Sequence, residues 1–370
     1  MSGLERSPLH DALKSAGAAF GEVDGWEMPK VFQNIKAEYL SGKGTVAAID
    51  RSHFGRLKVT GLQRLDLLHR ISTNDIKGLV AGQGTETVMC TEKGRIRDRL
   101  LVYADADHYL VVTSPNMAAP IKEIIEKVRF RDDVTIEDVT SKTAMISLLG
   151  PETGRLLEWV SRATVKDLKP HQWRRVPIEG VSVLVARLTG CVGGDGFNLI
   201  VDAAEGGTVW NEIFAQGGSY GLNPMGSEAY EMLRVEFGVA AQGREITEEF
   251  NPLEARLDAA VHWSKGCYTG QEVIARLDSR HKIQKLLVGL LIDQGGVPEP
   301  RSRIFAGKVE VGVVTSVVPS LEMRRIIALA YVRNEQSAPG TRVEIHSGGG
   351  VIGAEVAALP FRPTPSPHAH

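Results

Sequence analysis

The residues best suited to chemistry lie in one octet, residues 265–272, which reads Lys-Gly-Cys-Tyr-Thr-Gly-Gln-Glu. Thr269 and Glu272 have the spacing of a capping box, and an apolar run follows, so a helix is predicted to begin there. Cys267 then lies just before the helix, near Lys265. The helix dipole and the ammonium both favour the thiolate, which is how a reactive cysteine is built.

Simpler interpretations of this region stay open. A cysteine among aromatic and apolar residues is most often a small buried hydrophobe, and composition alone favours that interpretation for Cys267. The stretch that follows is rich in cations, which could hold an anionic tail or complement the C-terminal dipole of the helix. Its basic residues are Arg276, Arg280, His281, Lys282 and Lys285.

A second set of chemically capable side chains lies close together at Asp50, Ser52 and His53. Three such near neighbours on an extended chain cannot converge into a catalytic triad, and no Gly-x-Ser-x-Gly motif is present. Asp50 and His53 are therefore interpreted as structural or pocket-lining residues.

Composition defines the class of protein that must position these residues. The chain has 370 residues, enough for two or three packed units. Hydrophobic residues make up 43% and charged residues 24%, which excludes a disordered chain. Lys and Arg number 43 against 45 Asp and Glu, a net charge of −2, so no global basic field attracts nucleic acid or an anionic membrane.

Targeting and redox signals point to the cytoplasm. Residues 1–20 carry charges where a signal peptide needs an apolar core, and no apolar run is long enough to span a bilayer. Cys90, Cys191 and Cys267 are far apart and odd in number, which argues against disulfides and a zinc ribbon. The histidines lack metal-ligand spacing, so no metal site is predicted.

Hydrophobic periodicity predicts a mixed order of helices and strands. Apolar residues recur at helical spacing over 121–128, with Pro120 at the expected first helical position. Alternating runs over 85–113 predict an antiparallel meander, and short β-branched runs after residue 285 predict a small barrel or sandwich. Because strands and helices do not alternate regularly, the predicted fold class is α+β.

The octet resembles the hallmark of the YgfZ-type tetrahydrofolate-binding proteins, which are linked to iron-sulfur enzyme maintenance. The rest of the chain resembles the wider superfamily of the glycine-cleavage T-protein, an aminomethyltransferase, and its N-terminus is T-protein-like. The supporting stretches are 8–11 (Pro-Leu-His-Asp), 25–29 (Gly-Trp-Glu-Met-Pro), 50–55 (Asp-Arg-Ser-His-Phe-Gly), 73–75 (Thr-Asn-Asp), 193–197 (Gly-Gly-Asp-Gly-Phe), 251–255 (Asn-Pro-Leu-Glu-Ala) and 359–361 (Leu-Pro-Phe).

The resemblance implies three domains that ring a central folate channel, with a C-terminal β-barrel. The implied units are residues 1–50 with 140–245 as α+β domain 1, 51–139 as α+β domain 2, 246–284 as a motif-bearing connector, 285–362 as the barrel and 363–370 as a loose tail.

Three positions depart from the T-protein pattern. T-proteins resemble one another in an Asp-Asp pair whose second carboxylate lies at the folate atom that receives the one-carbon unit, and here the pair reads Asp98-Arg99. A strand alternates its faces, so Asp98 is expected to point away from that atom unless the register shifts by one. Asn198 replaces a carboxylate that would hold the donor edge of a pterin, and Tyr230 stands where an Arg is expected.

The resemblance predicts a tetrahydrofolate-binding accessory protein in iron-sulfur cluster assembly or repair, with assembly or client proteins as partners. Its reactive Cys267 must then face a cavity that admits a reduced pteridine. The alternatives are a folate-dependent aminomethyltransferase served by a lipoyl carrier, a folate-dependent demethylase, or a non-enzymatic scaffold. The predicted catalytic residues are Cys267 and Asp98, and the implied folate-binding residues are Lys265, Tyr268, Arg234, Asp195, Asn198, Arg99 and Tyr103.

Overall fold

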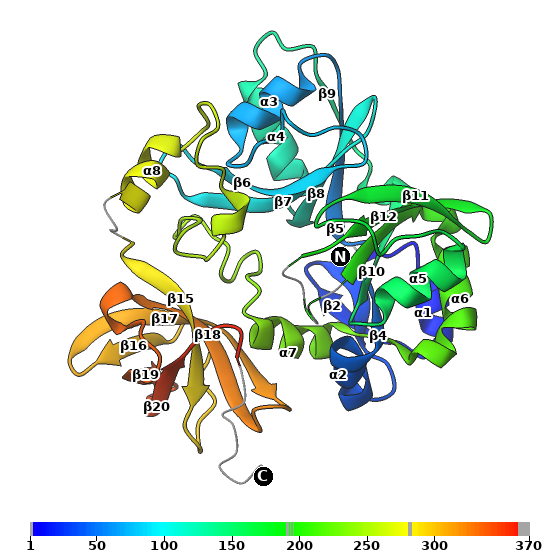
Figure 1. The fold of residues 1–370 in the computed structure, drawn as a ribbon. Coiled ribbons are helices and arrows are strands. Elements are labelled where there is room, and N and C mark those ends of the chain that lie inside the picture. The colour runs from blue at the N-terminus through cyan, green and yellow to red at the C-terminus, as the bar shows by residue number, and fades with distance from the viewer. Residues whose placement is uncertain (1–2, 190–191, 193, 195, 280–282, 362–370) are drawn as a thin grey trace.

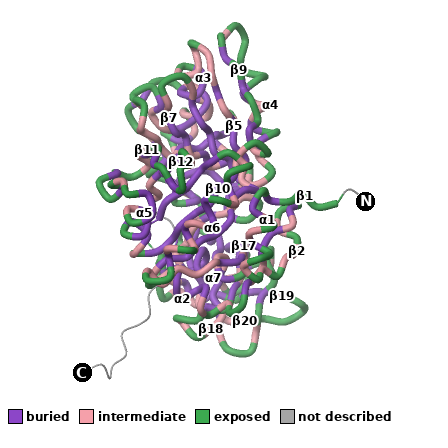
Figure 2. The backbone as a smooth tube through the Cα atoms, turned by 90° about the vertical axis from the view of Figure 1, so that its right-hand side faces the viewer, coloured by how far each residue is buried: buried purple, intermediate pink, exposed green. Residues whose placement is uncertain are grey.

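Three β units surround the centre of the molecule in the computed structural model, which describes residues 3–189, 192, 194, 196–279 and 283–361. Figure 1 shows a five-stranded sheet at the top, a six-stranded sheet at the right and a closed barrel at the lower left. Figure 2 shows that buried segments run through the interior of the molecule, whereas exposed segments lie in its outer loops. The predicted α+β class, the three-part ring and the C-terminal barrel are confirmed.

A small N-terminal sheet was not predicted. It has the order β1-β3-β2, and its strands are β1 (Glu5–Arg6), β2 (Ala19–Val23) and β3 (Trp26–Val31). The β2–β3 hairpin turns at Asp24 and Gly25, whose φ angles are 51° and 82°. An Asp-Gly pair with both φ angles positive suits a type I′ turn, which matches the twist of a hairpin. This turn carries Asp24, which is exposed.

The six-stranded sheet has the order β11-β12-β13-β10-β4-β14, and only its β14–β4 pairing is parallel. Its strands are β4 (Val46–Asp50), β10 (Thr143–Leu149), β11 (Trp173–Ile178), β12 (Val181–Arg187), β13 (Gly196–Asp202) and β14 (Leu222–Pro224). Three helices share one hydrophobic core with this sheet, and they are α1 (His10–Ser15), α5 (Thr153–Ser161) and α6 (Gly206–Gly217). Trp210 of α6 is almost fully buried in that core.

The five-stranded sheet has the order β6-β7-β8-β5-β9 and is antiparallel throughout. Its strands are β5 (Phe54–Thr60), β6 (Gly84–Cys90), β7 (Ile96–Ala104), β8 (His108–Pro115) and β9 (Thr135–Asp138). Helices α3 (Arg64–Ile71) and α4 (Ala118–Val128) cover one face. The other face packs against the six-stranded sheet through Tyr103, Trp173 and Ile200.

The C-terminal barrel closes in the order β15-β18-β17-β16-β19-β20. Its strands are β15 (Lys285–Ile292), β16 (Arg303–Ala306), β17 (Val309–Ser320), β18 (Arg325–Arg333), β19 (Arg342–Ser347) and β20 (Gly350–Ala357). Helices α2 (Ile35–Gly44) and α7 (Ser227–Phe237) contact one another, and α7 also contacts β17. Short 3-10 turns lie at Thr140–Lys142, Ala203–Glu205, Gly218–Tyr220, Asp258–Ala260 and Asn334–Gln336.

Two local predictions differ from the structure. Helix α4 begins at Ala118, so Pro120 occupies its third position, still within the first turn, where the missing N–H is tolerated. Helix α8 (Gln271–Ser279) begins at the seventh residue of the octet, as the prediction of a helix start requires. The Thr269 N–H, however, donates to the Arg70 carbonyl (3.1 Å), and no capping box between Thr269 and Glu272 forms among the described residues.

The division into domains stays a prediction, and the proposed tail lies outside the described residues. None of the helices in the described part of the chain is long and apolar enough to cross a bilayer.

Candidate functional site

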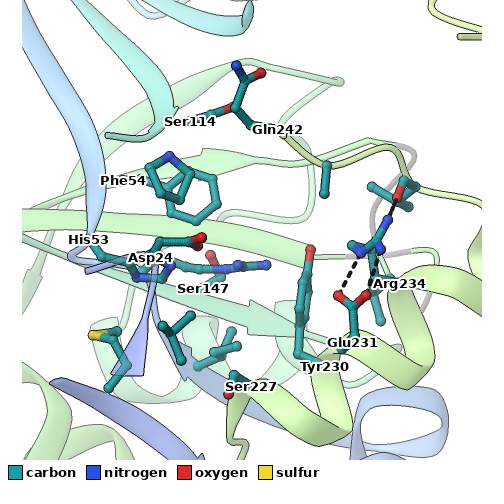
Figure 3. Close-up of a pocket in the computed structure, with 18 of the residues that line it drawn as sticks. Asp24, His53, Phe54, Ser114, Ser147, Ser227, Tyr230, Glu231, Arg234 and Gln242 are labelled. Atoms are coloured by element: carbon teal, nitrogen blue, oxygen red, sulfur yellow. Dashed lines mark hydrogen bonds and ion pairs between the residues drawn. The ribbon is translucent and has the colours of Figure 1, made fainter. Parts of the chain in front are cut away.

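A cavity of about 830 Å³ opens where the sheets and α7 meet. Figure 3 shows side chains from the N-terminal hairpin, the 53–54 region, strand β10 and α7 pointing into it. Its wall also includes residues from β7, the 114–117 turn, the 239–246 loop and strand β17. Each major unit of the fold therefore contributes to one central site.

Helix α7 supplies one part of the wall. Gly238 ends the helix with a φ of 70°, a backbone conformation that favours glycine. Arg234 is almost fully buried, and it is held by Glu231 (2.6 Å), Glu245 (2.9 Å) and the Ser316 hydroxyl (2.6 Å). Burial opposes its charge, but the two carboxylates outweigh that effect and raise the pKa of Arg234. Its guanidinium is therefore fully engaged within the protein.

Strand β7 presents Arg99, rather than Asp98, to the cavity. Leu100 and Val102 belong to the core under α3 and α4, while Leu101 packs with the residues between the two sheets. The strand alternates as expected, because the register irregularity in the β6–β7 pairing lies before Asp98. Arg99 therefore lines the cavity, with its Nε 3.9 Å from Glu86.

Asp98 is completely buried outside the cavity wall. Its two carboxylate oxygens accept the backbone N–H groups of Arg99 (2.8 Å) and Ser114 (3.0 Å). Burial raises the pKa of Asp98 to about 6, against the lowering effect of these hydrogen bonds. Its environment is that of a structural carboxyl group that fixes β7 against β8.

Asn198 lines the cavity from β13. Its Oδ1 accepts a hydrogen bond from the Ser147 hydroxyl (2.6 Å), and its Nδ2 donates a longer one to the Tyr103 hydroxyl (3.4 Å). Tyr103 lies behind this wall and is buried, which raises its pKa to about 12. Asp195, predicted nearby, lies outside the described residues.

Several buried polar atoms around the cavity lack a hydrogen-bond partner among the described residues. They are Asp50 Oδ2, His53 Nδ1, His171 Nδ1 and Gln242 Oε1. Burial and the charges of Arg51 and Arg56 lower the pKa of His53 to about 3, so its ring is neutral at pH 7. An unpaired buried polar group costs roughly 1–3 kcal/mol, which a ligand's polar atoms can offset. The cavity is therefore built for a polar ligand.

Asp24 and Arg51 also reach the cavity. The guanidinium carbon of Arg51 lies 3.7 Å from the ring centre of Tyr230 and 4.8 Å from that of Phe54. Burial raises the pKa of Asp24, against the opposing charges of Arg244 and Arg51. Sequence reasoning missed both side chains, although the Asp-Gly turn could have located Asp24.

The octet of residues 265–272 does not line the cavity. The Cys267 side chain is exposed and does not contribute to the cavity wall, so the expected thiol facing the cavity is not found. Lys265 is buried, with Nζ donating to the carbonyls of His69 (2.6 Å), Ser72 (2.7 Å) and Asn74 (2.6 Å). These bonds fasten the octet to the end of α3.

Burial lowers the pKa of Lys265 to about 8 and raises that of Tyr268 to about 12. Tyr268 packs in a hydrophobic core. Of the predicted site residues, the cavity brings together Arg99, Asn198 and Arg234, while Lys265, Tyr268 and Tyr103 serve the surrounding structure. No group of His, Cys, Asp and Glu suited to a metal ion occurs in the part of the chain that the structure describes.

Two family models match the chain along most of its length. Residues 9–265 match the GCVT N-terminal domain, and residues 285–362 match the glycine cleavage T-protein C-terminal barrel domain. A protein of Halalkalibacterium halodurans named aminomethyltransferase is 33% identical over 365 residues, covering 98% of this chain and 99% of the relative. One of Saccharopolyspora erythraea with the same name is 31% identical over 365 residues, with the same coverage.

The fold has a close structural counterpart. The crystal structure of the glycine cleavage system aminomethyltransferase T from Bartonella henselae superposes with a TM-score of 0.86. It covers 97% of this chain and 98% of the other at 23% identity, which supports the fold alone.

These comparisons correct one prediction. Relatives spanning nearly the full chain carry the name aminomethyltransferase, so the predicted accessory function in iron-sulfur assembly is wrong, and its predicted partners are unsupported. The matches support the wider superfamily but not the YgfZ-type branch. The octet misled because a short motif was given more weight than the pattern of the whole chain.

Proposed function

Because the chain belongs to the glycine cleavage T-protein family, we propose that it transfers a one-carbon unit to tetrahydrofolate bound in the central cavity. The observation that carries this proposal is the group of unpaired buried polar atoms in a cavity of about 830 Å³. A cavity of that size accommodates a ligand with several fused or linked rings. A pteridine has hydrogen-bond donors and acceptors along its edge, which suit such a wall.

Three wall residues are proposed to hold the folate. Gln242 Oε1 is an unpaired acceptor for a pteridine N–H, and Asn198 Nδ2 makes only a long bond to Tyr103, so it can turn to the ligand. Arg99 has donors left over, because its contact to Glu86 is at 3.9 Å. Arg99 and Asn198 stand where the T-protein pattern has carboxylates, so the folate is expected to be bound mainly by amides and a guanidinium.

The proposed donor, by analogy with the relatives' name, is an aminomethyl group on a lipoyl carrier protein. The donor's carbon–sulfur and carbon–nitrogen bonds break as the carbon joins N5 and N10 of the folate. The two folate protons pass to the sulfur and to the departing ammonia, so atoms and electrons balance. The cavity residues bind and orient the folate for this exchange.

The test is a direct assay. The purified protein is incubated anaerobically with tetrahydrofolate and an aminomethylated lipoyl carrier, and methylenetetrahydrofolate and ammonia are measured. Arg99→Ala should weaken tetrahydrofolate binding about tenfold or more, because a charge-assisted hydrogen bond contributes roughly 1.5–3 kcal/mol. Absence of both product and saturable folate binding by the unaltered protein would contradict the proposal.

Arg97→Ala is the matched control. Arg97 lies two residues away on the same strand, pairs with Glu248 (2.9 Å) and is not part of the cavity wall. The control variant should therefore bind tetrahydrofolate as the unaltered protein does.

A further inference from the structure

Four arginines line the cavity, and three have carboxylate partners. Arg99 lies near Glu86, Arg234 pairs with Glu231 and Glu245, and Arg244 pairs with Glu231. The side chain of Arg51 forms no ion pair and donates no hydrogen bond to the other described residues. A guanidinium has five N–H donors, so a half-buried one without protein partners calls for an anion.

Contacts of both the backbone and the guanidinium hold Arg51 in its orientation. Its backbone N–H donates to the Met145 carbonyl (2.8 Å), and its guanidinium packs against the rings of Tyr230 and Phe54. Cation–π stacking occupies the faces of the guanidinium and leaves the N–H groups at its edge available. That edge matches a carboxylate, which can accept two parallel hydrogen bonds.

Asp24 offers the complementary charge. Its backbone carbonyl accepts a hydrogen bond from Asn116 Nδ2 (2.8 Å), which anchors the hairpin turn to the five-stranded sheet. Its carboxylate forms no hydrogen bond or ion pair with other described residues, although the charge of Arg51 acts on it. The two groups therefore face one cavity without pairing with each other.

We propose that Arg51 and Asp24 form a donor subsite for a small amino acid, with its carboxylate at Arg51 and its amino nitrogen at Asp24. This inference rests on the proposed transfer of a one-carbon unit to tetrahydrofolate, and adds a second donor beside the lipoyl-bound aminomethyl group: a small amino acid methylated on nitrogen. Folate carries carboxylates on its glutamate tail, which are the other source of such an anion. Arg51 is half-buried and Asp24 is exposed, so the folate titration below distinguishes the two sources.

The transfer balances for an amino acid methylated on nitrogen. The donor's nitrogen–methyl bond breaks and leaves its electron pair on that nitrogen, while the methyl carbon forms a bond to N5 of tetrahydrofolate. The N5 proton then replaces the methyl group on the amine. No oxidant or reductant is needed.

The experiment measures binding by calorimetry with three probes of similar size. N-methylglycine is the smallest amino acid with a carbon to transfer, N-methylglycinamide lacks the carboxylate, and propionate lacks the amine. The unaltered protein should bind N-methylglycine at least about tenfold more tightly than either analogue. Equal affinities for all three would overturn the proposal, and this comparison needs no variant to fold.

Single substitutions then test whether Arg51 binds the carboxylate and Asp24 the amino nitrogen. Arg51→Met should weaken N-methylglycine binding about tenfold or more and leave N-methylglycinamide binding unchanged. Asp24→Asn should also weaken N-methylglycine binding, but it should leave the binding of propionate, which has no amine, unchanged. The matched control is Arg131→Met, because Arg131 also lies against an aromatic ring, that of Phe130, but outside the cavity.

Tetrahydrofolate is titrated into the same proteins. Its affinity should be nearly unchanged in Arg51→Met. If the affinity of Arg51→Met for tetrahydrofolate falls about tenfold or more, Arg51 binds the folate tail and the inference is wrong. Protein that binds N-methylglycine but not tetrahydrofolate would support the subsite while contradicting the proposed function.

Discussion

Asp98 and Arg99 are consecutive residues on β7, yet only Arg99 reaches the cavity. The alternation of a strand sends the carboxylate toward α3 and α4 and the guanidinium toward the ligand site. The Asp98 carboxylate therefore lies outside the cavity wall. At this position the cavity presents a cation to its ligand.

The raised pKa of Asp98 predicts a specific pH dependence of stability. The folded protein keeps this proton up to about pH 6, whereas the unfolded chain loses it near 3.8. Between these values the unfolded state binds fewer protons, so the contribution of Asp98 to the free energy of unfolding falls as the pH rises. The total fall is about 2 to 3 kcal/mol.

Asp98→Asn should remove this dependence. The difference in unfolding free energy between unaltered and variant protein, measured with urea from pH 4 to 7, should decrease with rising pH. Asp107→Asn is the control, because the hydrogen bond from His108 holds the pKa of that exposed carboxyl below its usual range. Its difference should stay nearly constant over this range, because a carboxyl with a lowered pKa adds pH-dependent stability only below about pH 4. A difference that is constant with pH for Asp98→Asn would contradict the burial argument.

At the scale of elements, the octet acts as a tether between α3 and α8. The Lys265 ammonium satisfies three carbonyls at the end of α3, and Thr269 donates to a fourth, that of Arg70. Lys265→Met should destabilise the protein by about 2 to 4 kcal/mol, because buried carbonyls lose charged donors. Urea unfolding at pH 7 measures this loss.

Lys93→Met serves as the matched control for that variant. Lys93 is exposed in the β6–β7 turn, so the same loss of an ammonium there should change stability by less than about 0.5 kcal/mol. Equal stability of the two variants would show that the Lys265 tether contributes nothing.

Secondary structure was predictable where a periodic pattern is long. The apolar spacing over 121–128 located α4, and Gly238 marked the end of α7. The capping box failed because tertiary contacts decide where the Thr269 N–H donates. Propensity alone cannot anticipate that the α3 terminus lies beside the octet.

The site was only partly predictable for a similar reason. Arg99, Asn198 and Arg234 were identified through a family pattern in the sequence, and they line the cavity. Arg51 and Asp24 are far in sequence from most of the residues that line the cavity, so only the packed fold brings them to the same wall. Cys267 had the local signature of a reactive thiol, but its exposed side chain lies outside the cavity wall, and only the packed fold decides that.

At the scale of the whole molecule, α7 joins the barrel to the rest of the ring. Glu236 accepts hydrogen bonds from Tyr39 (2.7 Å) on α2 and from Ser320 on β17. Two residues earlier on the helix, Arg234 reaches Ser316 of β17 and Glu245 of the following loop. Two buried polar contacts from one helix therefore set the position of the barrel against the cavity.

Breaking the Arg234 contact should weaken the whole assembly. Arg234→Met leaves the completely buried Glu245 without its cation, and an uncompensated buried charge costs about 3 to 5 kcal/mol. Scanning calorimetry should show a lower melting temperature and a barrel transition that separates from the main one. Arg303→Met removes an exposed ion pair to Glu310 (2.8 Å) within the barrel and should cost less than about 1 kcal/mol. If the two variants melt alike, in one transition, then hydrophobic contacts alone hold the barrel in place, and the cavity wall does not depend on this charge pair.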